Sequence, residues 1–286
     1  MITTPQQPMV HGSVPTPEVG TRSKGSKTRR RVTKALTIAG GAVVALLALG
    51  WVGLHIQPAP FAAIPRPAAP PETMPIPAGL PAPVERYYRV TYGDRVPVIT
   101  SGVLSGRGTL RLFHITFPLR FRFIHAADRS FRAYFELSIF GLPLMKIDEH
   151  YVDGKFVAER GPFGVEANEP KTGDHGAALR MWGEWVSWLP AMLLTDRDVR
   201  WEPVDDTTAL LVVPVGAAQE RAIVRFDPVT GKVQYYEAMK YKYPADTTKT
   251  LWVNAVWFGD TPWATFNIED AVYNVPVDTS LKAKGP

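Results

Sequence analysis

The segment at residues 174–194, DHGAALRMWGEWVSWLPAMLL, decides the fold that the sequence predicts. Its apolar residues recur at helical spacing, Asp174 stands where an N-cap is expected, and Pro190, which has no amide proton, should kink or end the helix. The apolar residues of this helix are Met181, Trp182, Trp185, Trp188, Leu189 and Met192. A helix that is apolar around so much of its circumference must be covered by other elements on most of its sides.

The sequence around this helix predicts antiparallel strands. Apolar and polar residues alternate over 119–123, 131–137 and 222–226, which is typical of strands with one buried and one solvated face. Turn sequences occur at Asp153-Gly154, Asp227-Pro228-Val229-Thr230-Gly231 and Gly259-Asp260. We expect about ten strands, mostly joined as hairpins, and a short amphipathic helix over Val84–Tyr92. The predicted fold class is mainly β with one major helix (α+β): a strongly curved antiparallel sheet, or open half-barrel, packed on the Trp-rich helix.

A second apolar segment, Ala35–Leu54, carries no charge and predicts one transmembrane helix at 35–55. At about 1.5 Å per residue, a helix of this length reaches roughly 30 Å, the thickness of a bilayer's hydrocarbon core. Residues 1–34 have few apolar side chains and predict a disordered basic tail. Because the basic residues precede the apolar segment, we expect a single-pass protein of the cell membrane with a cytoplasmic N-terminus and an extracytoplasmic C-terminal domain.

A proline-rich segment separates this helix from the domain. Between Pro58 and Pro83 the chain has ten prolines in 26 residues, so residues 56–83 predict a semi-rigid polyproline stalk that holds the domain, residues 84–286, off the membrane. The small residues at 58–63 also offer a cleavage site, and a cleaved signal peptide is the alternative to an anchor.

The distribution of charge argues against a nucleic-acid partner. The chain has a net charge of +5, but residues 1–34 hold seven basic residues and one acid, and the rest of the chain holds 25 basic and 26 acidic residues. A nearly neutral domain lacks the basic face that nucleic-acid binding requires. The absence of cysteine excludes disulfides, thiolate metal sites and cysteine nucleophiles.

The first catalytic candidates are Asp148 and His150, which face one side of a predicted strand while Glu149 faces the other. Together with His114 or His125 from neighbouring strands, they would supply carboxylate and imidazole ligands for a metal. Solvated polar residues on a strand explain the same pattern, and we expect neither a resident metal nor a cofactor. Motifs of serine hydrolases, P-loops and dinucleotide-binding sites are absent from the sequence, and Gly102, Gly106 and Gly108 are typical of bulges or turns in strands.

Glu184 is the third catalytic candidate. If it were desolvated among tryptophans, its pKa would rise toward the range of a general acid. An ion pair with Arg180 at spacing i, i+4 is the alternative that we favour. The density of tryptophan also suggests an apolar ligand pocket. The candidate ligand-binding residues are Arg180, Met181, Glu184, Trp185, Trp188 and Trp201, and the other tryptophans of the domain are 182, 252, 257 and 263.

Several blocks of the sequence resemble one bacterial family of domains of unknown function, numbered sixty-five forty-four. They are Leu80–Tyr87, Asp148–Lys155, Glu184–Pro190, Val199–Asp206 and Arg225–Asp227 with Gly231. The resemblance covers nearly all of residues 80–278, but a tryptophan-bearing segment frequent in the family is replaced here by Phe113–Pro118. It implies no activity and assigns no catalytic residue. By analogy alone, the expected architecture is similar to the half-barrel of lipoprotein carriers of the LolA type.

Three functions remain open at this point. The first is a membrane-anchored domain that binds an apolar, lipid-like ligand between sheet and helix. The second is an envelope hydrolase that uses Glu184 or the pair Asp148 and His150. The third is a structural or interaction module with a filled interior and no pocket.

Overall fold

A computed structural model describes residues 25–112, 114–161, 165–168, 171–241, 248–255 and 263–285. The chain divides into two compact units, residues 1–49 and residues 50–286. The tail residues 1–24, Trp257 and the predicted turn at Gly259-Asp260 lie outside the described residues.

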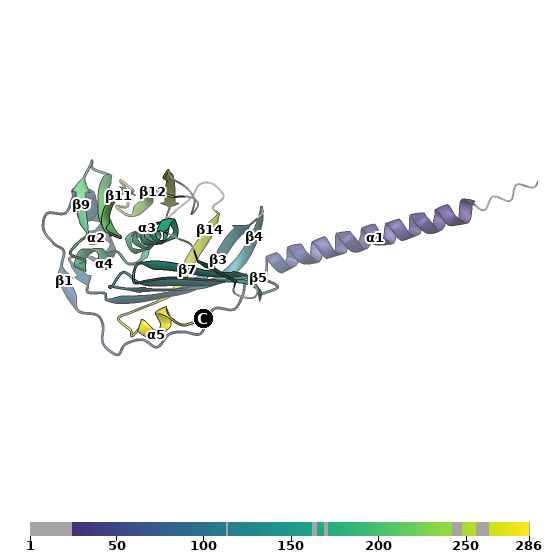
Figure 1. Ribbon diagram of the computed structural model, residues 1–286, viewed down its shortest axis with the longest axis horizontal. Helices are drawn as coiled ribbons and strands as arrows, with labels where there is room; N and C mark the ends of the chain where they lie inside the picture. Colours follow the sequence, from purple (N-terminus) through teal and green to yellow (C-terminus); the bar gives the residue numbers. More distant parts are fainter. Residues whose placement is uncertain are drawn as a thin grey trace, which may run out of the picture. The chain divides into compact units, whose positions relative to one another are not determined.

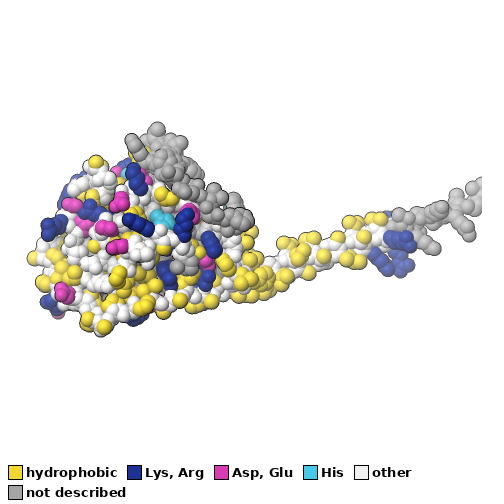
Figure 2. All heavy atoms as spheres, turned by 60° about the horizontal axis from the view of Figure 1, so that its bottom comes forward, with side chains coloured by type: hydrophobic (Ala, Val, Ile, Leu, Met, Phe, Trp, Pro, Cys, Tyr) yellow, Lys and Arg dark blue, Asp and Glu magenta, His cyan; other side chains and the backbone are white. Residues whose placement is uncertain are grey.

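The N-terminal helix α1 spans Gly25–Leu54. Its stretch Arg29–Leu54 contains an 18-residue window with a mean hydropathy of 2.1 and is long and apolar enough to cross a membrane, a property that signal sequences share. Hydrophobic side chains line α1, with basic side chains gathered at its N-terminal end (Figure 2). The helix begins ten residues before the predicted Ala35. These residues include no proline, and lysine and arginine readily extend a helix that is already nucleated.

Antiparallel strands are the main elements of residues 50–286. A seven-stranded sheet has the order β14-β3-β4-β5-β6-β7-β8, and a five-stranded sheet has the order β13-β12-β11-β10-β9. The strands of the larger sheet are β3 (Ser101–Leu112), β4 (Ile115–Ala126), β5 (Phe131–Ile139), β6 (Leu142–Val152), β7 (Lys155–Gly161), β8 (Val165–Asn168) and β14 (Ala264–Tyr273). Those of the smaller are β9 (Arg200–Pro203), β10 (Thr208–Val215), β11 (Ala218–Phe226), β12 (Val233–Lys240) and β13 (Thr250–Ala255).

The Trp-rich helix lies between these two sheets. Helix α3 (Lys171–Trp188) packs on β10 and β12 on one side and on β6 and β7 on the other (Figure 1). Helix α4 (Pro190–Thr195) follows the break at Leu189 that Pro190 predicts. The α+β, mainly antiparallel class is confirmed, but the described strands number fourteen and form separate sheets. Because α3 is apolar on opposite faces, it needs a cover on both sides, and a sheet supplies each one.

Tyrosines of a short helix fix the position of α3 and α4. Helix α2 (Ala82–Tyr92) confirms the helix predicted at Val84–Tyr92. The Tyr87 hydroxyl donates to the Val186 carbonyl at 2.8 Å and the Tyr88 hydroxyl donates to the Pro190 carbonyl at 2.9 Å. Both rings are buried, so these bonds satisfy the phenols, and the bond from Tyr87 also occupies the Val186 carbonyl, whose i+4 residue Pro190 has no amide proton to donate.

Asp174 lies inside the first turn of α3, because the helix begins at Lys171 and not at the predicted N-cap. Its carboxylate accepts a hydrogen bond from the Phe156 amide at 2.7 Å, which ties the start of α3 to β7.

The proline-rich segment 56–83 lies along the outer face of the larger sheet instead of extending away as a spacer. The Arg120 guanidinium donates to the Ala59 carbonyl at 3.1 Å and stands 4.3 Å from the centre of the Phe61 ring. Further along, β1 (Thr73–Pro75) pairs with β2 (Arg95–Pro97). Carbonyls of a polyproline chain have no internal partners, and the arginines on this face of β4 supply donors to them.

Two features of the sheets match the turn chemistry of the sequence. Asp153 and Gly154 join β6 to β7 with φ angles of 52° and 74°, as a two-residue hairpin with both central residues left-handed requires. Gly106 lies in the middle of β3 opposite a bulge in β14, and a Cβ placed on it would stand 1.9 Å from the Asn267 carbonyl oxygen. This glycine therefore permits a close approach of two strands.

Candidate functional site

A buried group of charged residues lies where α3 faces the larger sheet. The Arg180 Nε donates to Glu184 Oε1 at 2.6 Å, which realises the i, i+4 ion pair expected from the sequence. The other oxygen, Glu184 Oε2, is 3.3 Å from His125 Nε2. The Trp185 indole donates to His125 Nδ1 at 3.2 Å, so the imidazole proton belongs on Nε2, the nitrogen nearer to Glu184.

Strand β6 adds a second carboxylate to this group. Glu149 is buried and accepts a hydrogen bond from Arg160 of β7 at 3.0 Å. Its other oxygen pairs with Arg180. We call Arg180, Glu184, Glu149, Arg160 and His125 the inner ionic cluster. Arg180 pairs with Glu184 of α3 and with Glu149 of β6, so the cluster joins the helix to the sheet. Both carboxylates interact with the charge of this one guanidinium.

The electrostatic state of Glu184 differs from that of a general acid. Burial alone would raise the pKa of Glu184, but the charge of Arg180 and the hydrogen bonds from His125 and Arg180 hold this pKa below its ordinary value. The carboxyl group is therefore ionised at neutral pH, and the hypothesis of a raised pKa is wrong. The cause is the ion pair, which outweighs desolvation.

The pKa of Lys240 of β12 is also lowered, which for a lysine favours the neutral form. Burial and the charge of Arg180 together lower the pKa of Lys240 to about 8, against the opposing effect of Glu149. The ammonium group therefore lies within electrostatic range of the inner ionic cluster, although it belongs to the other sheet.

A wall of aromatic rings continues from the cluster toward one end of the sheets. The Arg180 guanidinium stands 5.5 Å from the centre of the Phe123 ring. The centre of the Phe123 ring is 5.5 Å from that of Trp188 and 5.1 Å from that of Phe266 of β14. The ring centres of Phe266 and Phe135 are 6.3 Å apart. Trp188 and Phe266 are only partly buried, so this end of the wall is partly open to solvent.

The other candidate ligand-binding residues occupy different surroundings. Met181 and Trp185 are fully enclosed in the core, as is Trp182, with exposed fractions of 1%, 0% and 0%. Trp201 lies on β9, 6.3 Å from Phe226, and thus at the edge of the smaller sheet. Only Arg180, Glu184 and Trp188 of the proposed set lie on the partly open side of the cluster. Trp263 is 58% exposed.

Asp148 and His150 lie on the opposite face of the larger sheet. Arg132 makes two hydrogen bonds of 2.7 Å to the Asp148 carboxylate, and His150 contacts Asp148 at 3.0 Å and the Leu281 carbonyl at 2.8 Å. The partner Leu281 ends helix α5 (Asp278–Leu281), which covers this face. These residues therefore hold the C-terminal segment against the sheet, and Glu149 points to the other side, as predicted.

The proposed metal ligands do not converge. His114 lies exposed in the turn between β3 and β4, and His125 faces α3 on the side away from His150. Among the residues that the structure describes, no three histidine, aspartate or glutamate side chains are grouped as metal ligands would be.

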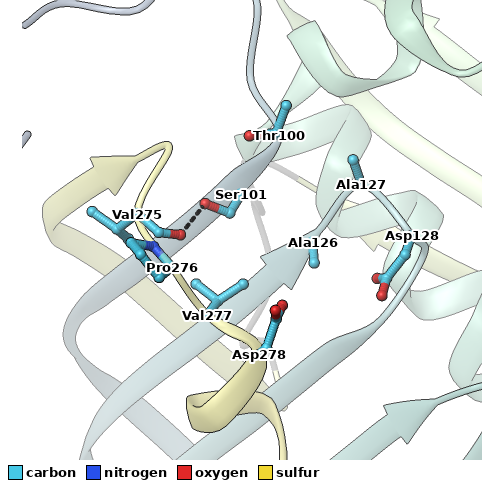
Figure 3. Close-up of a pocket in the computed structure, with 9 residues that line it drawn as sticks. All are labelled: Thr100, Ser101, Ala126, Ala127, Asp128, Val275, Pro276, Val277 and Asp278. Carbon is cyan, nitrogen blue, oxygen red and sulfur yellow. Dashed lines mark hydrogen bonds between the residues drawn. The ribbon is translucent and has the colours of Figure 1, made fainter.

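Two surface depressions also lie on the face that carries α5. One of about 260 Å³ is bounded by the ends of β3 and β4 and by residues 275–278 after β14, where the Ser101 hydroxyl donates to the Val275 carbonyl at 2.7 Å (Figure 3). The other, of about 520 Å³, adjoins His150, Lys155 and Lys284. Residues of α3 line neither of them.

The pairing of His125 with Glu184 and the place of Phe266 were not predicted from the sequence. His125 follows Phe121 and Phe123 at spacing two, and this periodicity places it on the core face of β4. That signal indicates burial, but it contains no information about which residue of α3 stands opposite. Phe266 reaches the wall because β14, the last strand, pairs with β3.

The described strands and helices define a two-sheet α+β domain with a helix enclosed between the sheets. The chain belongs to DUF6544, a family of unknown function, whose model matches residues 72–261. The match begins one residue before β1 and so includes the end of the proline-rich segment. Comparisons with curated proteins and with solved structures give no match, and the analogy with LolA-type carriers stays untested.

Proposed function

We propose that this chain is a single-pass membrane protein with a cytoplasmic N-terminus whose extracytoplasmic domain binds an apolar, lipid-like ligand against Trp188 and Phe266. The observation that carries this proposal is the aromatic wall, which begins at the buried inner ionic cluster and ends at two partly exposed rings. Ligand sites of this kind combine an apolar lining with a few fixed polar groups.

Retention of α1 as an anchor, in preference to its cleavage as a signal peptide, is supported by the residues that follow it. The Phe140 amide donates to the Gly53 carbonyl at 2.8 Å, and Phe61 lies against Arg120 and Tyr134. Cleavage at the small residues 58–63 would remove these contacts from the domain. The basic residues at the start of α1 support the proposed orientation.

Of the expected ligand-binding residues, which include both Trp185 and Trp188, packing favours Trp188 for the proposed site. Trp182 and Trp185 meet edge to face at 4.9 Å and are fully buried, so their part of the interior is already filled. Trp188 stacks on Phe123 at the end of α3, next to the break before Pro190, and keeps part of its surface open.

The filled interior around Trp182 and Trp185 also favours the second candidate, a structural or interaction module with no ligand. The hydrolase hypothesis has less support, since Glu184 is buried and ionised and Asp148 is held by Arg132.

Fluorescence quenching distinguishes ligand binding from the structural module. The full chain in lipid nanodiscs, with Trp51→Phe to remove the tryptophan of α1, is titrated with a brominated fatty acid, which quenches tryptophans that it contacts. We expect saturable quenching that Trp188→Phe reduces and that Trp201→Phe leaves unchanged. Quenching that is equal in both variants, or absent, would contradict the proposed site and favour the structural module.

A further inference from the structure

The two ends of the larger sheet differ in polarity. Consecutive hairpins alternate between the ends, so the β4–β5 and β6–β7 turns share one end, and the β3–β4 and β5–β6 turns share the other. The first end carries the exposed charges of Asp128, Asp153 and Lys155. In the hairpin at the second end, residues 139–145 read IFGLPLM, without a charge.

Several apolar side chains at this second end are exposed to solvent. Four of them, with their exposed fractions, are Ile115 at 46%, Phe140 at 39%, Leu142 at 69% and Leu144 at 49%. We call these four residues the apolar rim. Four exposed apolar side chains on two neighbouring hairpins are unusual for a surface that faces water, and surfaces rich in such side chains mark contacts with protein or membrane.

The position of the β5–β6 hairpin in the chain indicates which of these contacts applies. Within the unit 50–286, the Phe140 amide bonds the Gly53 carbonyl, and a Cβ on Gly53 would stand 2.7 Å from the Phe140 ring. Gly141 lies against Ile56 and Gln57. The hairpin therefore packs on the last residues of the apolar helix and on the residues that follow it directly.

We infer that the apolar rim rests in the interface of the lipid bilayer that α1 spans. The exposed side chains are then removed from water at the level where the helix leaves the hydrocarbon core, as in other interfacial apolar segments. Exposed Arg111 and Lys146 stand next to the rim on β3 and β6, where cations favour anionic headgroups. The aromatic wall includes Phe123 of β4 and Phe135 of β5, and the rim lies at the ends of these two strands. Contact of the rim with the bilayer would therefore also bring the proposed ligand site close to the membrane surface. The inference rests on the proposed membrane anchor.

Spin labelling tests the inference, because the chain contains no cysteine and each introduced thiol is unique. Leu46→Cys, Leu142→Cys and Val229→Cys variants of the full chain are labelled with a nitroxide and reconstituted into vesicles of phosphatidylcholine and phosphatidylglycerol. Val229 is the matched control, since it is an exposed apolar residue of a turn in the smaller sheet. Tryptophan emission before labelling confirms that each variant is folded.

Collision rates with oxygen and with a water-soluble nickel complex then report the surroundings of each label. We expect the label at 142 to collide several-fold more with oxygen relative to nickel than the label at 229 does. A label at 142 that matches the one at 229, while the label at 46 stays in lipid, overturns the inference and leaves the anchor standing. A label at 46 in water overturns the proposed anchor itself. A label at 142 shielded from both reagents assigns the rim to a protein partner and also overturns the inference.

Discussion

Two arginine–glutamate pairs have the same i, i+4 spacing but different burial. They show how the surroundings of a residue determine its contribution to stability. Arg180 and Glu184 meet at 2.6 Å beneath the sheet, and Glu184 is buried. Arg89 and Glu85 meet at 2.8 Å on α2, with about half of each side chain exposed. Removing one partner of a buried pair leaves an uncompensated charge in a poorly solvated place, whereas water screens the remaining partner of an exposed pair.

Glu184→Ala should therefore lower the free energy of unfolding by about 3 kcal/mol, because it leaves the partly buried Arg180 with Glu149 as its one carboxylate partner. Urea unfolding of the full chain in detergent, followed by tryptophan emission, measures the change. Glu85→Ala is the matched control and should have a much smaller effect. Equal losses in the two variants would show that the inner ionic cluster does not support the fold.

The contact between His150 and the C-terminal segment should make stability depend on pH. Burial alone would lower the pKa of His150, but its bonds to Asp148 and to the Leu281 carbonyl raise this pKa above its ordinary value. A raised pKa in the folded state contributes stability that is complete below the unfolded value of about 6.5 and is lost as the pH rises through the folded pKa.

The stability difference between the native chain and His150→Gln should accordingly be larger at about pH 5.5 than at about pH 9. Urea unfolding at the two pH values measures it. Asp148 does not interfere, since its pKa is lowered to about 2 and its contribution is lost only as the pH falls toward that value. A difference that does not change with pH would mean that folding leaves the pKa of His150 unchanged.

At the scale of elements, the sequence predicts what local chemistry determines. The break of the Trp-rich helix at Pro190 and the hairpin at Asp153-Gly154 follow from a missing amide proton and from left-handed backbone angles. The division into two sheets, and the docking of residues 56–83 on β4, depend on contacts distant in sequence, and neither could be predicted. The ion pair of Arg180 and Glu184 was predictable because both residues lie on one helix, whereas its partners Glu149 and His125 come from other strands.

The pairing of β14 with β3 depends on a glycine at the closest point between these strands. Gly106→Ala should shift or detach β14, at a cost of about 3 kcal/mol or more, because the new Cβ meets backbone that cannot rotate away. Hydrogen exchange of the peptide 264–273 should rise. Gly176→Ala in α3 is the control: its Cβ meets no atom within 4 Å, and alanine favours a helix by up to about 1 kcal/mol. Unchanged exchange in Gly106→Ala would contradict the close approach.

At the scale of the whole molecule, the segment after α1 connects the topology to the fold. A spacer without contacts to the domain would tolerate insertions, and its cleavage would not change the stability of the domain. In the structure, the Phe61 ring contacts Arg120 and Arg122 of β4. Strand β1 of the same segment pairs with β2. The proposed membrane attachment and the packing of the domain therefore share residues 53–62, and loss of α1 by cleavage near residue 63 would also remove part of the outer cover of the larger sheet.

We accordingly expect the chain to stay uncleaved and oriented with its tail inside. Alkaline phosphatase fused after residue 286 should be active in a bacterial host, the same enzyme fused before residue 1 should be inactive, and an N-terminal epitope should remain on the membrane-bound chain. Changing Arg29, Arg30 and Arg31 to glutamate should lower the C-terminal activity, because these residues hold the start of α1 in the cytoplasm. The same triple substitution to lysine is the control and should preserve it. A secreted product without the epitope, beginning near residue 63, would contradict the anchor and establish α1 as a signal sequence.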